Sequence, residues 1–284
     1  MGGARALATL DRIEDALRRV VDDAPAPIRA AVAAALAPPA KRLRPRVALL
    51  AYEAAGGRVA EEGTRAAVAA ELFHAASLTV DDVVDGARTR RGRPAVHVEH
   101  GLRAALLAAG FLVNRAQRLA AGDDELPTLE AEHVRVFRDA VDQVLAAEAL
   151  ALARGGEATE AEWLEVARGK TGALFLAAAE GAARRADAPE PVVRALRRYG
   201  LSLGVAFQAA DDVLDVMGDP ARMGKEAGND GGAPNLARVV GVEAALAFAR
   251  ALAEDAAEAL EALPASEARA QLAELARGAA RRDR

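Results

Sequence analysis

The sequence contains no cysteine among its 284 residues, which excludes disulfide bonds, thiolate catalysis and cysteine-ligated zinc. An excess of positive charge is also absent, because the formal net charge is −5 and the isoelectric point is about 5.6. A protein that binds nucleic acid needs a basic surface to contact the phosphate backbone. We therefore expect no nucleic acid among its partners.

Long hydrophobic runs are missing as well. No uninterrupted stretch reaches the ~18 apolar residues that identify a membrane-spanning helix. The N-terminal segment also lacks the basic start and apolar core of a secretory signal. We expect a cytoplasmic protein without an integral membrane segment.

What the sequence does contain is a helical period over most of its length. Apolar residues recur at spacings of three and four, and alternating strand patterns are absent. The segments with this period are 6–22, 27–37, 45–56, 60–85, 102–120, 128–154, 159–185, 189–217 and 242–278. Thr159 and Glu162 match a capping box at the start of one of them. We predict an all-α protein, with residues 1–284 forming one large helical bundle.

Two acidic pentapeptides stand out against this alanine-rich background: "DDVVD" at 81–85 and "DDVLD" at 211–215. The first and last aspartates of each are four residues apart, so they share one helical face and repel each other. An acidic cluster is commonly just a solvated helix end. Here, however, each follows an apolar run, "ELFHAASLTV" or "SLGVAFQAA", that indicates a buried helix. We interpret the pair as facing walls of a cavity that binds a hard cation such as Mg²⁺.

Cationic residues follow or flank these motifs. Arg90 and Arg91 come shortly after the first, Lys225 comes after the second, and "KRLRP" at 41–45 and "GKTGALF" at 169–175 add further cations. Lys170 lies in an apolar helical segment, where a buried ammonium group needs an anionic partner. Carboxylates that hold Mg²⁺, together with Arg and Lys that bind oxyanions, indicate a site for diphosphate groups.

The ordered segments "KRLRP", "FHAASLTVDDVVDGARTRRGRPAVH", "GKTGALF" and "GVAFQAADDVLDVMGDPARMGK" resemble the motifs of the trans-type polyprenyl diphosphate synthases. That family includes the farnesyl, geranylgeranyl and longer-chain synthases. The resemblance implies an isoprenoid-synthase bundle around a central cavity and a homodimeric enzyme. It also implies a Mg²⁺-dependent prenyltransferase that joins isopentenyl diphosphate head-to-tail to an allylic diphosphate.

The resemblance assigns roles to particular residues. Asp81 and Asp85 would hold two of three Mg²⁺ ions and Asp211 the third. The remaining acids of the motifs would serve as further ligands or as partners of the ligands: Asp82, Asp212 and Asp215. The allylic diphosphate would be bound by Arg90, Lys170 and Lys225. Isopentenyl diphosphate would be bound by Lys41, Arg44, His74 and Arg91.

Thr171 and Gln208 would direct oxygen dipoles toward the allylic carbocation without trapping it. His74 has a second interpretation, because a lone histidine on an apolar helical face is more often a hydrogen-bonded core residue.

The resemblance also gives a partial indication of the length of the product. In this family a bulky residue four or five positions before the first aspartate ends chain growth early, and these positions hold the small residues Ser77 and Ala76. We expect a product of C20 or longer, and we expect Phe111 and Leu107 to form a deeper floor.

The sequence departs from the family pattern at five positions, Ala40, Val80, Gly110, Ala151 and Asn235, of which the first and the last concern residues that bind diphosphate. Ala40 stands where glycine is usual before the first lysine, and Asn235 stands where a second diphosphate-binding lysine is expected. Two alternatives therefore stay open. One is a class I terpene cyclase on the same fold, and the other is a noncatalytic regulatory subunit of a heteromeric prenyl synthase.

Overall fold

The computed structural model describes residues 2–37, 42–58, 60–121, 132–153, 158–217 and 234–280. Within these ranges the fold is all-α apart from one pair of two-residue strands, which confirms the predicted fold class. The helices are α1 (Gly2–Asp22), α2 (Arg29–Leu36), α3 (Leu43–Ala54), α4 (Ala60–Val84), α5 (Val96–His100), α6 (Leu102–Ala121), α7 (Glu132–Ala153), α8 (Glu160–Ala167), α9 (Ala173–Arg185), α10 (Glu190–Met217), α12 (Leu236–Val240), α13 (Val242–Ala259) and α14 (Glu267–Ala279).

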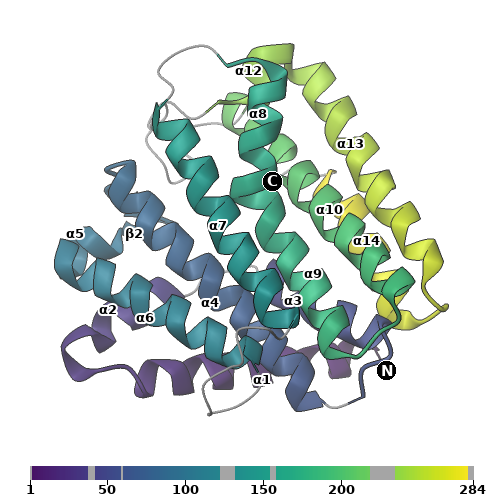
Figure 1. Ribbon diagram of the computed structural model, residues 1–284. Coiled ribbons are helices and arrows are strands. Elements are labelled where there is room, and N and C mark those ends of the chain that lie inside the picture. The colour runs from purple at the N-terminus through teal and green to yellow at the C-terminus, as the bar shows by residue number, and fades with distance from the viewer. Residues whose placement is uncertain are drawn as a thin grey trace.

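Four long helices, α7, α9, α10 and α13, lie side by side in that order (Figure 1). The helix with the first acidic motif, α4, packs against α3, α6 and α9. Its residues from Ala66 to Phe73 are all buried, so α4 is covered on every side along this stretch. The core is built mainly from alanine, which lets neighbouring helices approach closely. None of the helices in the described ranges is both long and apolar enough to cross a membrane.

Glycines allow α10 to pack closely against α9 and the segment before it. A Cβ atom at Gly204 of α10 would lie 2.7 Å from the Cα atom of Gly172, and one at Gly200 would lie 2.5 Å from the carbonyl oxygen of Phe175. Both distances are shorter than any normal contact, so a larger residue would push α10 away from α9. This close packing fixes the helix that carries the second acidic motif relative to the segment that carries Lys170.

The sequence-based boundaries hold for most helices but fail at three points. The predicted helix 159–185 begins with the expected capping box at Thr159, and is then divided by a π-helical turn at Arg168–Gly172. The predicted helix 242–278 is broken because Pro264 lacks the amide proton a helix needs, and α14 restarts with Ser266 as its N-cap. The third point concerns short elements that the helical pattern did not reveal. These are the helices α5 and α12 and a hairpin of β1 (Thr89–Arg90) and β2 (Arg93–Pro94).

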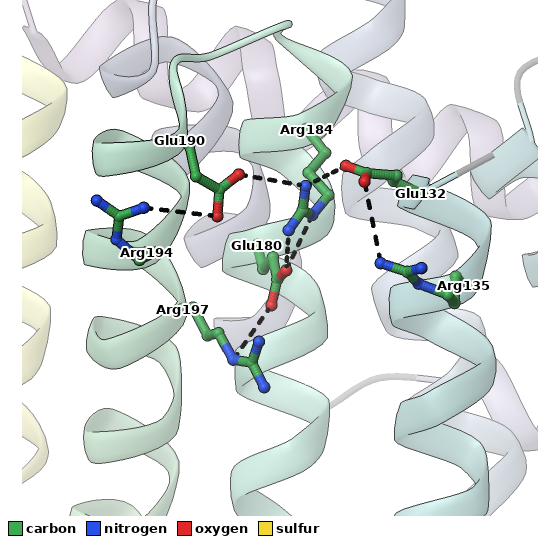
Figure 2. Close-up of polar contacts among 7 residues, drawn as sticks. All are labelled: Glu132, Arg135, Glu180, Arg184, Glu190, Arg194 and Arg197. Atoms are coloured by element: carbon green, nitrogen blue, oxygen red, sulfur yellow. Dashed lines mark hydrogen bonds and ion pairs between the residues drawn. The ribbon is translucent and has the colours of Figure 1, made fainter.

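An ion-pair network joins three helices at the ends of α9 and α10 that lie away from the acidic motifs (Figure 2). Glu180 of α9 is buried; it accepts a 2.9 Å hydrogen bond from Arg184 Nε and lies 3.7 Å from Arg197 Nε of α10. Arg184 also pairs with Glu132 of α7 and with Glu190. The network ties α7, α9 and α10 together far from the cavity described next.

Candidate active site

The two acidic motifs line a single cavity of about 520 Å³. The first motif ends α4 and the second lies in the last two turns of α10, so helix packing brings residues from distant parts of the chain together. The predicted site residues that line the cavity are Arg44, His74, Asp81, Asp85, Arg90, Arg91, Lys170, Thr171, Gln208, Asp211, Asp212 and Asp215. Lys41 and Lys225 lie outside the described residues.

The middle aspartate of the first motif has a different environment from the outer two. Asp81 and Asp85 line the cavity, whereas Asp82 is only 2% exposed. The Oδ1 atom of Asp82 accepts hydrogen bonds from the guanidinium of Arg90, one of them 2.8 Å from Nε. Arg90 belongs to β1, and the turn that follows has positive φ angles at Arg91 and Gly92, as in a tight type I′ hairpin. Asp82 thus holds the hairpin that carries Arg90 and Arg91 to the cavity.

The second motif repeats this division. Asp211 and Asp215 line the cavity, while the buried Asp212 has both oxygens occupied by protein donors. These donors are Trp163 Nε1 at 2.6 Å, the amide nitrogen of Leu236 at 2.7 Å and Gln208 Nε2 at 2.9 Å. Burial raises the pKa of Asp212 to about 6 although the three hydrogen bonds act in the opposite direction. The side chain fastens the end of α10 to α8 and to the start of α12.

A hydrogen-bonded pair extends from Asp212 along the cavity wall. Thr171 Oγ1 donates a 2.7 Å hydrogen bond to Gln208 Oε1, and Gln208 in turn donates to Asp212. Asn235, where the sequence pattern lacks a lysine, caps α12 and donates from Nδ2 to the carbonyl oxygen of Asp212 at 3.1 Å. Asn235 therefore supports the wall through hydrogen bonds and supplies no positive charge.

Lys170 lies in the π-helical turn, and π-turns within helices are frequent at functional sites. Its Nζ atom is 2.7 Å from Glu148 Oε1 and 3.3 Å from Asp81 Oδ2. Burial lowers the pKa of Lys170, but the charges of Asp81, Glu148 and Asp85 more than compensate, so its pKa lies above the ordinary value. The ammonium group therefore stays protonated at neutral pH.

Glu148 of α7 is a cavity residue that the sequence analysis missed. Burial and the nearby charge of Asp81 raise its pKa to about 7, although Lys170 acts in the opposite direction. A signal was present, because Glu148 is the only charged residue in the run "VLAAEALALA" at 144–153. A single acidic residue in an apolar run needs a cationic partner, in the same way that the buried Lys170 needs an anionic partner.

Arg44 and His74 also line the cavity and lie next to each other. Arg44 Nη1 lies 3.1 Å from His74 Nε2, and the guanidinium lies over the ring of Phe175 at 4.4 Å. Burial, followed by the charges of Arg44 and the neighbouring arginines, lowers the pKa of His74 well below its ordinary value. The imidazole is therefore neutral at physiological pH, and its Nε2 accepts a hydrogen bond from Arg44.

The residue that holds this part of the cavity wall in place is Arg42, which the sequence analysis grouped with the cationic residues. It occupies a left-handed conformation with φ of 47° directly before α3. Its buried guanidinium donates to Glu71 at 2.5 Å, to Glu14 at 2.7 Å and to the carbonyl oxygen of Leu36 at 2.9 Å. Arg42 thereby joins α1, α2 and α4 to the first turn of α3, where Arg44 lies.

Residues 25–245 match the family described as polyprenyl synthetase. The chain belongs to the polyprenyl synthetase family. A curated relative, the short chain isoprenyl diphosphate synthase of Methanothermobacter thermautotrophicus, is 38% identical over 196 residues. That match covers 67% of this chain and 58% of the relative's own length.

Two solved structures of polyprenyl synthetase relatives share the fold over nearly the whole chain. The geranylgeranyl pyrophosphate synthetase of Pyrococcus horikoshii has a TM-score of 0.88 at 29% identity, with 99% of this chain and 98% of that chain covered. The polyprenyl synthase of Caulobacter crescentus, crystallised with calcium and isoprenyl diphosphate, has a TM-score of 0.83 at 31% identity, with 96% and 97% covered.

The polyprenyl synthetase family is metal-dependent, and the cavity has donors that suit a hard cation. The candidate ligands are the carboxylates of four lining residues: Asp81, Asp85, Asp211 and Asp215. Carboxylate oxygens favour Mg²⁺ over softer metals. Among the described residues, however, no three His, Asp or Glu side chains converge closely enough to hold an ion by themselves. Carboxylates on two walls therefore fit Mg²⁺ only if substrate phosphates and water complete the coordination, which is how this ion is commonly bound.

Proposed function

We propose that this chain is a Mg²⁺-dependent trans-prenyltransferase that condenses isopentenyl diphosphate head-to-tail with an allylic diphosphate. The observation that carries the proposal is that both acidic motifs line one cavity together with Lys170, Arg44, Arg90 and Arg91. Carboxylates alone would repel a diphosphate, and cations alone would need no acidic motifs. Their combination suits a metal-bound diphosphate with cationic partners.

The outer aspartates, Asp81 and Asp85 on α4 and Asp211 and Asp215 on α10, would hold three Mg²⁺ ions. When bound, Mg²⁺ supplies positive charge that stabilises the departing diphosphate. The middle aspartates act through the residues they hold, because their oxygens already accept protein hydrogen bonds.

The cationic residues divide between two substrates. Arg90, Lys170 and Lys225 neutralise the allylic diphosphate, so that its C–O bond breaks with the electron pair leaving on oxygen. Lys41, Arg44 and Arg91 hold isopentenyl diphosphate with its alkene toward the cation, and the neutral His74 orients Arg44. The new C–C bond forms from the alkene, and the proton lost afterwards goes to the released diphosphate.

The carbocation needs walls that do not react with it. Leu174, Val144 and Phe207 line the cavity and offer only carbon atoms. Thr171 donates a hydrogen bond to Gln208, so that its hydroxyl oxygen is a weak dipole near the cation. Ser77 also lines the cavity and Ala76 is buried beside it, so neither closes the space early. We expect a product of C20 or longer.

The predicted deeper floor needs one correction. Leu107 is 61% exposed, so it points away from the core and does not close an internal cavity.

Leu107 is one of four exposed leucines on α6 and α7, together with Leu102, Leu106 and Leu145. Solvent-exposed leucines on neighbouring helices favour a protein contact, and we propose this face as the interface of a homodimer. We propose that the whole chain forms one helical domain, because residues from both halves form the cavity. We also propose that it acts in the cytoplasm.

The deciding experiment supplies purified protein with Mg²⁺ and labelled isopentenyl diphosphate. Dimethylallyl, geranyl and farnesyl diphosphate are each tested as the allylic partner, and the dephosphorylated products are sized. Labelled prenols of C20 or longer support the proposal. Cyclic hydrocarbons from the allylic substrate alone would establish a cyclase. A protein that binds both diphosphates but forms product only with an added partner would be a regulatory subunit.

A further inference from the structure

Glu148 and Lys170 form an ion pair that the proposed chemistry does not by itself require. The two groups come from different elements, α7 and the π-helical turn. Neither is a surface residue, because the side chain of Glu148 is 16% exposed and that of Lys170 is 27% exposed. Both line the cavity beside Asp81.

The contact between these two elements is sterically fixed. A Cβ atom at Gly169 would lie 2.6 Å from the Cβ of Ala147 and 2.8 Å from the carbonyl oxygen of Gln143. Only glycine allows the backbone next to Lys170 to lie this close to α7. Gly169 and Ala147 are the immediate chain neighbours of Lys170 and Glu148, so the backbone contact holds the ion pair in place.

The local charges are unbalanced. Lys170 contributes one positive charge, whereas Asp81, Asp85 and Glu148 together contribute three negative charges when ionised. A free diphosphate approaching Lys170 meets an ammonium group that already contacts two carboxylates. Mg²⁺ at the two aspartates would cancel their charge and leave Lys170 with Glu148 as its remaining carboxylate partner.

We propose that Glu148 is a positioning residue that, together with the two aspartates, keeps the charge around Lys170 negative until the metal is present, so that diphosphate binding depends on Mg²⁺. This inference rests on the proposed function of the same cavity. It assigns Glu148 no contact with substrate. Its effect passes through Lys170, whose ammonium group it holds beside the first acidic motif.

The test measures binding of inorganic diphosphate by titration calorimetry in mildly alkaline buffer, with and without Mg²⁺. Without metal, Glu148→Gln should bind diphosphate on the order of tenfold more tightly than the wild type, because one repelling charge is gone and Lys170 is released. The double variant Glu148→Gln with Lys170→Gln should lose this gain. The matched control is Asp142→Asn, an equal charge change at an exposed position of the same helix, which should bind as the wild type does.

Equal metal-free affinities in the wild type and Glu148→Gln would overturn the inference. If Glu148→Gln melts at a lower temperature than the wild type, the same binding measurement is made on Glu148→Ala, which removes the same charge. If the wild type binds diphosphate with Mg²⁺ and forms prenols, but Glu148→Gln has the same metal-free affinity, only this inference is refuted. A wild type that fails to bind diphosphate with Mg²⁺ would refute the proposed function as well.

Discussion

The indole Nε1 of Trp163 lies 2.6 Å from Oδ2 of Asp212 and donates a hydrogen bond to this buried carboxylate. Trp163 is itself only 1% exposed. The bond connects α8 with the middle aspartate of the second motif, one residue away from Asp211. A contact that fixes the fold therefore also fixes a cavity residue.

Trp163→Phe should lower the free energy of unfolding by about 1–3 kcal/mol, because a buried carboxylate loses a donor. It should also reduce turnover, since the end of α10 loses its link to α8. Chemical denaturation and steady-state assays measure the two effects. The control is Phe248→Leu, which alters a ring packed edge-on against Trp163 but keeps the hydrogen bond. Equal turnover in the two variants would contradict the role given to Asp212.

His74 gives a prediction for stability against pH. Its pKa in the folded protein lies well below 6.5, whereas the unfolded chain has the ordinary value. Below pH 6.5 the unfolded state therefore binds more protons than the folded state, and stability falls as the pH is lowered through this value. His74→Gln, whose side-chain oxygen can still accept from Arg44, should show a smaller loss on acidification.

Denaturation curves at neutral and mildly acidic pH measure this slope. His100→Gln is the matched control, because His100 is partly exposed and lies near Glu99. An unchanged slope in His74→Gln would show that the imidazole does not stay neutral in the fold.

Arg42 is predicted to act on Arg44 from outside the cavity. Arg42→Lys keeps the charge but cannot reach Glu71, Glu14 and the carbonyl oxygen of Leu36 together. The free energy of unfolding should fall by about 3 kcal/mol, because a buried ion pair is broken. The KM for isopentenyl diphosphate should rise more than the KM for the allylic substrate. The exposed Arg46 of the same helix gives the control, Arg46→Lys, which should alter neither KM.

The sequence predicted the features that depend on local patterns and missed those that depend on contacts between distant residues. Helical periodicity and the repeated acidic motif are local patterns, and they correctly predicted an all-α chain whose two motifs lie on helices. The different environments of Asp82 and Asp81 could not be predicted, because Asp82 meets Arg90 only through the hairpin. The π-helical turn was missed for a similar reason, since "RGKTG" fits a regular helix and the turn depends on packing against α7 and α10.

Two stacked aromatic rings should set the product length. Phe73 and Phe137 stack with ring centroids 5.3 Å apart. Phe73 lies one turn before Ser77 on α4, and Phe137 lies two turns before Val144 on α7, and both of these line the cavity. The ring of Phe137 also packs against Gly181, where an added Cβ atom would lie 2.8 Å away. We therefore expect the stack to close the space beneath the cavity.

Phe73→Ala or Phe137→Ala should lengthen the main product by at least one isoprenyl unit, measured by sizing the prenols. Each change costs about 3–5 kcal/mol of stability, so the assay is best run at low temperature. Leu272→Ala is the control, because it creates a comparable core defect on α14. Products of unchanged length in both phenylalanine variants would mean that another residue forms the floor.

The most direct test of the account replaces one outer aspartate from each wall of the cavity. Asp81→Asn and Asp211→Asn preserve shape but remove the charge that would hold Mg²⁺. Each should lower turnover by about two orders of magnitude or more while leaving the circular dichroism spectrum unchanged. A rate close to that of the wild type in either variant would contradict the claim that the two acidic motifs act on one diphosphate.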